Sequence, residues 1–175
     1  MSTLIRVRIV TVALTFAMAG LAARAAAEER PNPTAEVAGG TLLFADDGVV
    51  SEGFLGGAAR FYLTPKISVG PELAGIWGDR HSHLMLTGNL TYDLVGSVNG
   101  NPRPVTPFVV VGAGLFQTRE RFFSAETFTS TEGAFTAGGG VRARVGDVAF
   151  VGAEARVGWE LHVRLNGLVG FRFGR

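Results

Sequence analysis

The stretch that decides the fold covers residues 141–157 and reads VRARVGDVAFVGAEARV. Aliphatic residues alternate there with arginine, glutamate or glycine on both sides of the central pair Gly146-Asp147. Because successive side chains of a strand point to opposite faces, the alternation places the charges on one face and the aliphatics on the other. A Gly-Asp pair between two such runs is typical of a tight hairpin turn, so this stretch predicts two antiparallel strands.

The same period continues on either side of this hairpin, and no helical period occurs after the N-terminal segment. Proline and glycine with polar neighbours separate the alternating runs. We predict eight strands, at residues 35–45, 50–63, 67–77, 84–94, 107–117, 133–145, 148–159 and 161–173. The run 107–117 is apolar on both faces, so its orientation stays open. Tight connections are expected at 64–65 and 146–147 and longer ones at 79–83 and 118–132, with the 96–106 turn as an exception to this alternation.

The first 27 residues predict a cleaved secretory signal peptide. Arg6 and Arg8 precede a short apolar run, and the small residues 25–27 precede Glu28. The run is shorter than the roughly 20 apolar residues that a membrane-spanning helix needs. We therefore divide the chain into a signal peptide (1–27), an N-terminal linker (28–34) and one β-barrel domain (35–175).

The composition excludes several function classes. The whole chain has 16 basic and 15 acidic residues, and removing the signal peptide takes away three arginines and no acid. The remaining balance is slightly acidic and gives nucleic acid no reason to bind. The chain contains no cysteine, so it has no disulfide framework, thiolate chemistry or cysteine metal site.

The two faces of the predicted strands need different surroundings. An eight-stranded barrel has an interior that its own side chains nearly fill, which leaves little room for every Leu, Val, Phe and Trp of the chain. Acids and bases in near balance can instead pair inside, with the aliphatic face toward lipid. The polar face includes Glu36, Glu52, Arg164 and Arg172. From the same face we predict a lumenal charge network of Arg60, Glu72, Asp93, Arg142, Arg144, Glu154 and Arg156.

Residues 106–114 (TPFVVVGAG), 138–144 (GGGVRAR) and 152–156 (GAEAR) resemble one family in their order and spacing. That family consists of the small outer-membrane β-barrel proteins of Gram-negative bacteria, typified by the OmpA transmembrane domain and OmpX. The resemblance covers essentially the whole chain after the signal peptide. It implies an all-β, eight-stranded antiparallel up-and-down transmembrane β-barrel in the outer membrane.

The resemblance also implies partners. A terminal aromatic strand end is what the barrel-assembly machinery recognises in this family, and Phe171 and Phe173 match it, although Gly174 and Arg175 follow. Outer-membrane lipid and lipopolysaccharide are the other expected partners, with a monomer as the assembly state. Trp77, Trp159 and Tyr92 are the candidates for the membrane interfaces.

The predicted connection 118–132 holds the candidate surface contacts Arg119, Arg121, Phe122 and Phe123. Its arginines could bind the phosphates of lipopolysaccharide. Its phenylalanines could contact a partner or the membrane surface. The competing interpretation, which we favour, is that Phe122 and Phe123 extend the flanking strands as a rigid hairpin.

One short segment contains the residue types of catalysis. Asp79, His81, Ser82 and His83 are the groups of a hydrolase triad or of half a zinc site. Neighbours in one segment rarely reach triad geometry, and no second cluster completes a metal site. We therefore expect no enzyme activity, cofactor or metal.

The leading hypothesis is a non-enzymatic outer-membrane barrel with a structural or surface-interaction role. The alternatives are a soluble periplasmic β-barrel that binds a small apolar ligand and, less favoured, a lipid A-modifying enzyme.

Overall fold

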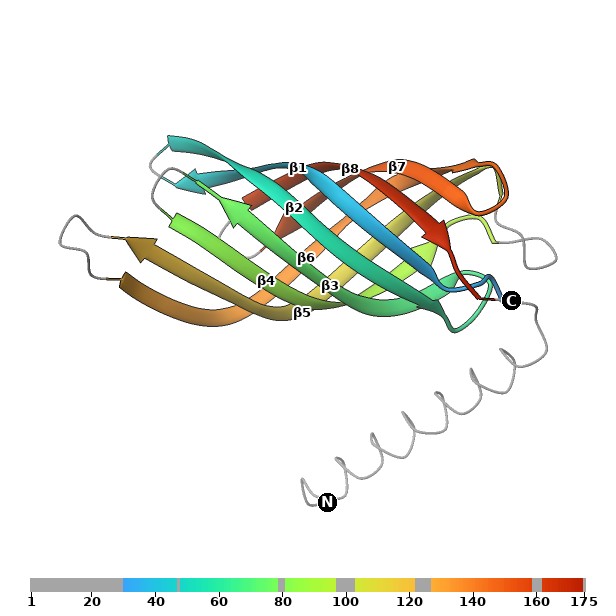
Figure 1. Cartoon of the computed structure of the whole chain (residues 1–175), viewed down its shortest axis with the longest axis horizontal. Coiled ribbons are helices and arrows are strands. Elements are labelled where there is room, and N and C mark those ends of the chain that lie inside the picture. Colours follow the sequence, from blue (N-terminus) through green and yellow to red (C-terminus); the bar gives the residue numbers. More distant parts are fainter. Residues whose placement is uncertain are drawn as a thin grey trace, which may run out of the picture.

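The computed structural model describes residues 30–46, 48–78, 81–96, 103–121, 127–158 and 162–174. They form eight antiparallel strands, each paired with the next, and the last strand pairs with the first to close a barrel (Figure 1). The strands are β1 (Thr34–Asp46), β2 (Gly48–Tyr62), β3 (Ile67–Trp77), β4 (His81–Asp93), β5 (Val105–Arg121), β6 (Thr127–Val145), β7 (Ala149–Gly158) and β8 (His162–Arg172). The predicted eight-stranded barrel is confirmed, whereas the predicted signal peptide lies outside the described residues.

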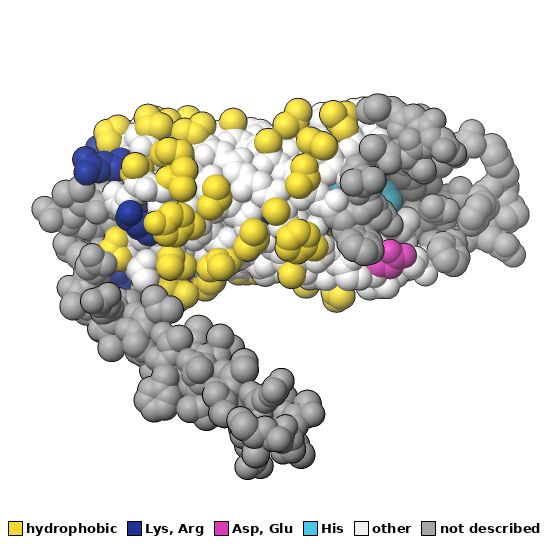
Figure 2. All heavy atoms as spheres, turned by 180° about the vertical axis from the view of Figure 1, so that it is seen from behind, with side chains coloured by type: hydrophobic (Ala, Val, Ile, Leu, Met, Phe, Trp, Pro, Cys, Tyr) yellow, Lys and Arg dark blue, Asp and Glu magenta, His cyan; other side chains and the backbone are white. Residues whose placement is uncertain are grey.

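Most outward side chains of the barrel are apolar, whereas the inward ones include the buried charged and polar side chains together with some apolar ones. On β4, the outward Leu90 is 47% exposed whereas its neighbour Asn89 is 8% exposed. Yellow hydrophobic side chains cover much of the cylinder in Figure 2. This arrangement inverts that of a soluble barrel and suits a wall surrounded by hydrocarbon. Trp77 ends β3 and Tyr92 lies near the end of β4, so these exposed aromatics mark opposite rims.

The orientation of β5, which the sequence leaves open, is settled by its neighbours. Phe108, Val110 and Phe116 are buried in the lumen, while Val109 and Leu115 are exposed on the outside. The family-like stretch 106–114 therefore contributes large apolar groups to both faces. No helix among the described residues is long and apolar enough to cross a membrane.

Glycines of β6 make room inside the barrel. A Cβ at Gly140 would overlap the carbonyl oxygen of Ala153 and press on the ring of Phe108. The glycine run at 138–140 thus lets β7 approach closely and leaves lumen volume for large side chains. Gly146 has a φ of 65°, which glycine adopts without strain, and it forms the predicted tight turn between β6 and β7.

The connections differ from the predicted alternation of short and long. At the end where β1 begins and β8 ends, which we call the end near the termini, 4, 11 and 3 residues separate the strands. At the opposite end, 1, 3, 5 and 3 residues separate them. The predicted long connection 118–132 is wrong, because β5 continues to Arg121 and β6 begins at Thr127. A serine- and threonine-rich stretch resembles a loop in sequence, but cross-strand pairing continues through it. The β5–β6 hairpin consequently projects beyond the other strands (Figure 1).

Candidate functional site

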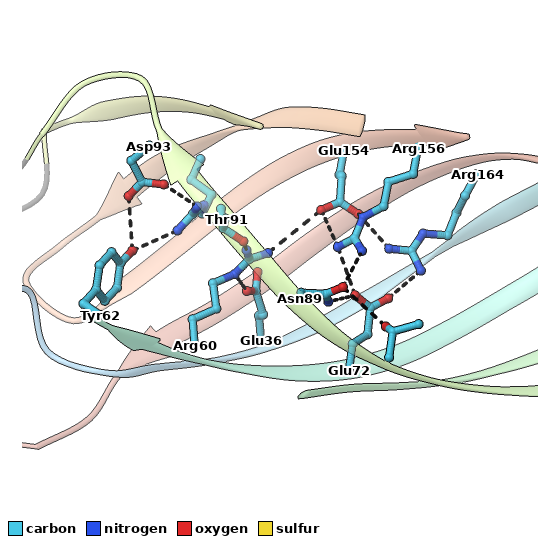
Figure 3. Close-up of polar contacts among 12 residues, drawn as sticks. Glu36, Arg60, Tyr62, Glu72, Asn89, Thr91, Asp93, Glu154, Arg156 and Arg164 are labelled. Carbon is cyan, nitrogen blue, oxygen red and sulfur yellow. Dashed lines mark hydrogen bonds and ion pairs between the residues drawn. The ribbon is translucent and has the colours of Figure 1, made fainter. Parts of the chain in front are cut away.

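The centre of the lumen holds a network of three arginines and three glutamates (Figure 3). Glu154 receives two hydrogen bonds from Arg156, at 2.7 and 2.9 Å, and one from Arg164 at 2.8 Å. Arg156 also lies 2.9 Å from Glu72, whose carboxylate accepts a further hydrogen bond from Arg164. Six charges from β3, β7, β8, β1 and β2 therefore meet within one layer of the barrel.

Polar side chains complete this layer. Arg60 donates to Glu36 and to the hydroxyl of Thr91, and it lies 3.9 Å from Glu154. Asn89 donates to Glu72 at 2.7 Å and accepts from Arg156 at 3.3 Å. The cavity inside this layer measures only about 10 Å³. A buried water needs about that much space, so the layer is packed by its own side chains.

A second ion pair lies nearer to the end that carries the termini. Arg142 donates to Asp93 at 2.8 Å and to the Tyr62 hydroxyl at 3.1 Å, and that hydroxyl donates to Asp93 at 3.3 Å. The ring of Phe108 lies under the guanidinium of Arg142, 4.3 Å away, and under that of Arg60, 5.3 Å away. With Phe108 on β5, all eight strands contribute a side chain to the ionic part of the lumen.

The opposite half of the lumen is apolar. Leu42, Phe54, Ile76 and Met85 pack there with Phe116 and two alanines, and Ile76 is completely buried. Arg164 connects the two halves, because its guanidinium lies 4.4 Å from the centre of the Phe54 ring. Ionic and apolar layers follow each other along the barrel axis, and alternation along the strands does not predict this layering.

A small polar group covers the far side of the apolar layer. His83 Nε2 lies 3.5 Å from Glu52, and His83 Nδ1 lies 3.0 Å from the hydroxyl of Thr118. The ring of His83 stacks on Phe116 at 4.9 Å, and Phe44 contacts both His83 and His162. This group lies inside the barrel toward the end where the β5–β6 hairpin projects.

The predicted lumenal residues fall into two groups. The structure brings together Arg60, Glu72, Asp93, Arg142, Glu154 and Arg156, all buried and paired. Arg144 does not join them, since it is exposed at the rim two residues before the Gly146 turn. Its placement in the network was wrong because alternation gives the face of a residue but not its height. Glu36 and Arg164, which share the polar face, belong to the buried network as well.

The candidate catalytic residues do not assemble. Ser82 pairs with the exposed Trp77 and His83 with the buried Ile76, so the two side chains lie on opposite faces of β4. Both ring nitrogens of His83 face Thr118 and Glu52 instead. Asp79 and the side chain of His81 lie outside the described residues. Among the residues that the structure describes, no group of three potential metal ligands is found.

Of the candidate surface and assembly residues, Arg119, Phe171 and Phe173 lie on the outside. Arg119 is exposed on the projecting hairpin, opposite Thr129, whereas Phe122, Phe123 and the side chain of Arg121 lie outside the described parts. Phe171 and Phe173 are exposed toward the lipid side with their ring centres 6.4 Å apart. Phe173 also donates its backbone N–H to Pro33 at 2.9 Å, which ties the end of the chain to its beginning.

Solved structures with a similar fold are small outer-membrane barrels. Neisserial surface protein A has a TM-score of 0.65 at 12% identity, over 81% of this chain and 96% of that one. The N-terminal β-barrel domain of Pseudomonas aeruginosa OprF has a TM-score of 0.63 at 16% identity, over 82% and 98%. The attachment invasion locus protein Ail of Yersinia pestis has a TM-score of 0.56 at 12% identity, over 82% and 99%. These likenesses concern the fold.

Among curated proteins, none has a significantly similar sequence. The family model described as "Outer membrane protein beta-barrel domain" matches residues 11–168. This match covers nearly the whole chain, and the inverted barrel with its apolar outer face agrees with it. The chain belongs to the outer membrane protein beta-barrel domain family and is an outer-membrane β-barrel protein.

Proposed function

We propose that this protein is a non-enzymatic outer-membrane barrel whose projecting β5–β6 hairpin makes contacts at the cell surface. One observation carries the proposal: β6 has 19 residues, but its pairing with β7 begins only at Thr136. Among the described residues, nothing pairs with Thr127–Glu132 on the side away from β5. Such an unpaired strand edge is a template for a strand of another chain.

The packed lumen supports a role outside the barrel rather than inside it. The ionic and apolar layers leave a central cavity of about 10 Å³, which is too small for an apolar ligand. The many exposed aliphatic side chains would be costly in water, which argues against the soluble alternative. The lipid-facing outer wall and the charged lumen then act as a scaffold that holds the hairpin in place.

The orientation follows from the termini. The first and last described residues, Arg30 and Gly174, lie at the same end of the barrel, where Asn32 donates a hydrogen bond to the carbonyl oxygen of Gly174 (Figure 1). A chain exported through the predicted N-terminal signal peptide arrives from the periplasm. We place that end in the periplasm and the β5–β6 hairpin outside. Arg119 would then face the lipopolysaccharide phosphates, for which a guanidinium is well suited.

The test uses purified barrel in neutral detergent, with intact or dephosphorylated lipopolysaccharide as the probe. Arg119→Ala should weaken binding to the intact form about fivefold, since one arginine near an anionic surface contributes about 1 kcal/mol. Lys66→Ala is the control, because Lys66 is an exposed basic residue at the opposite end of the barrel. Equal loss in both variants, or equal binding to both forms of lipopolysaccharide, would refute the role of Arg119.

Phe171 and Phe173 are proposed as the signal for the barrel-assembly machinery. Their exposure on and just beyond the last strand supports this role. Replacing both by alanine should slow insertion by the purified machinery, measured as the appearance of the heat-modifiable folded band. Phe61→Ala is the control, because Phe61 is similarly exposed on β2. A similar delay in the control would show a loss of lipid contacts rather than of a signal.

A further inference from the structure

The end of the lumen near the termini is basic, in contrast to the neutral centre. A hollow there is lined by Arg103, Arg142, Arg144 and Arg172, with Asp93 as its one carboxylate. These arginines come from β6, from β8 and from the connection before β5. Dark blue basic side chains gather at this end in Figure 2.

The described residues do not balance the positive charges of this hollow. Asp93 pairs with Arg142, which leaves three arginines around the opening. Arg172 donates to the backbone carbonyl of Asp147, which fixes its position without neutralising its charge. No carboxylate in the described part of the chain forms an ion pair with Arg103, Arg144 or Arg172. Every arginine of the central network, by contrast, has a glutamate partner.

The floor of the hollow is rigid and has unused hydrogen-bonding groups. Arg142 is only 6% exposed and is held by Asp93, Tyr62 and the ring of Phe108. The Nε of Arg142 has no hydrogen-bond acceptor among the described residues. The hydroxyl of Thr34, which is 2% exposed, has no hydrogen-bond partner among them either. Buried polar groups without partners cost about 1–3 kcal/mol each, so both are suited to contact an anion that enters the hollow.

The size of the hollow limits the ligand. Its volume is about 30 Å³, which corresponds to roughly two or three water positions and thus to one compact oxyanion. Arginines in a group fit the oxygens of a phosphate, with two parallel N–H bonds from each planar guanidinium. We propose that this hollow binds a single phosphate group, either of a small soluble phosphate or of a phospholipid head group at the rim.

The first test is isothermal titration of the refolded full barrel in maltoside detergent with inorganic phosphate, at constant ionic strength. We expect phosphate to bind saturably at one site, and we expect chloride not to compete with it. Arg144→Gln with Arg172→Gln should weaken it about tenfold or more, because charge-assisted hydrogen bonds are lost. Lys66→Gln is the control and should bind like the unchanged protein, because Lys66 is an exposed cation at the same end of the barrel that does not line the hollow.

Binding that does not saturate, or that the double variant retains in full, would overturn the proposal. Both altered residues lie at the rim outside the central network, and an unchanged unfolding midpoint verifies that the variant folds. A second arm compares phosphate binding in maltoside, which contains no phosphate, with binding in nanodiscs of phosphatidylcholine, whose head group carries a phosphate but no net charge. Weaker phosphate binding in the nanodiscs assigns the site to a lipid head group, and equal binding assigns it to a soluble phosphate. The result does not depend on whether the hairpin has a surface role.

Discussion

The lumen has an ionic half around Glu154 and an apolar half around Ile76, and side chains fill the two halves in different ways. In the ionic half, Glu154 alone contacts three arginines, so each charge depends on particular partners. In the apolar half, Ile76 and Met85 are equally buried but need only neighbours of the right volume. The ionic half therefore tolerates exchange of a complete pair, whereas the apolar half tolerates exchange of one residue for another of similar size.

The largest effect is expected from breaking the ionic half. Glu154→Gln keeps the shape of the side chain but leaves three arginines with two carboxylates. Removing one partner of a buried ion pair costs about 3–5 kcal/mol, and we expect that loss in the free energy of unfolding. Urea unfolding in lipid vesicles, followed by tryptophan fluorescence, measures it. Glu132→Gln, at an exposed acid on the hairpin, is the control, and a loss below about 1 kcal/mol would contradict the dependence on partners.

A somewhat smaller effect is expected from emptying space in the apolar half. Ile76→Ala removes three carbons from a completely buried side chain and should cost about 2–4 kcal/mol through the cavity that it leaves. Ile76→Leu conserves the volume and should cost less than about 1.5 kcal/mol. The same unfolding experiment compares the two variants. If Leu were as harmful as Ala, the apolar half would depend on precise shape as the ionic half depends on partners.

The smallest effect is expected from removing a complete pair. Glu36→Leu together with Arg60→Met leaves two arginines and two glutamates in the central layer, which stays neutral. Replacing a buried pair by apolar residues is often neutral or stabilising, so the free energy of unfolding should fall by no more than about 1 kcal/mol. Arg60→Met alone should cost several times more. Equal losses in the single and the double variant would show that pairing is not what the ionic half requires.

The sequence predicts which face of the barrel wall a side chain occupies better than it predicts the ionic and apolar layers of the lumen. On β4, strict alternation from Leu84 to Asp93 is enough to assign each side chain to a face, and the structure agrees. On β5 no such assignment is possible, because Phe108 and Val109 are both apolar. Phe108 is directed inward by contacts with Arg60 and Arg142, which belong to other strands. That information is not local to the sequence of β5.

The height of a residue along the barrel is also hidden from simple alternation. Arg142 and Arg144 share a face, yet only Arg142 reaches a carboxylate. The distance to the turn was an available signal, since Arg144 precedes Gly146 by two residues. A rigid hairpin is the interpretation that the sequence favours, but the start of β6 at Thr127 is hidden for a related reason. Beyond the membrane both faces of a strand meet water, so alternation disappears and residues 127–132 resemble a loop.

Closure of the barrel by β8 has a consequence for the order of assembly. Arg164 lies 92 residues from Glu72 along the chain, and it also contacts Glu154 on the neighbouring strand β7. Before β8 is in place, Glu72 and Glu154 therefore lack the guanidinium of Arg164, and β1 has an unpaired strand edge. The last strand supplies the missing positive charge and the missing hydrogen bonds in one step. Pairing of β8 thus removes the cost of unpaired buried charges and the cost of unpaired backbone groups together. Both changes favour the closed barrel over every shorter intermediate.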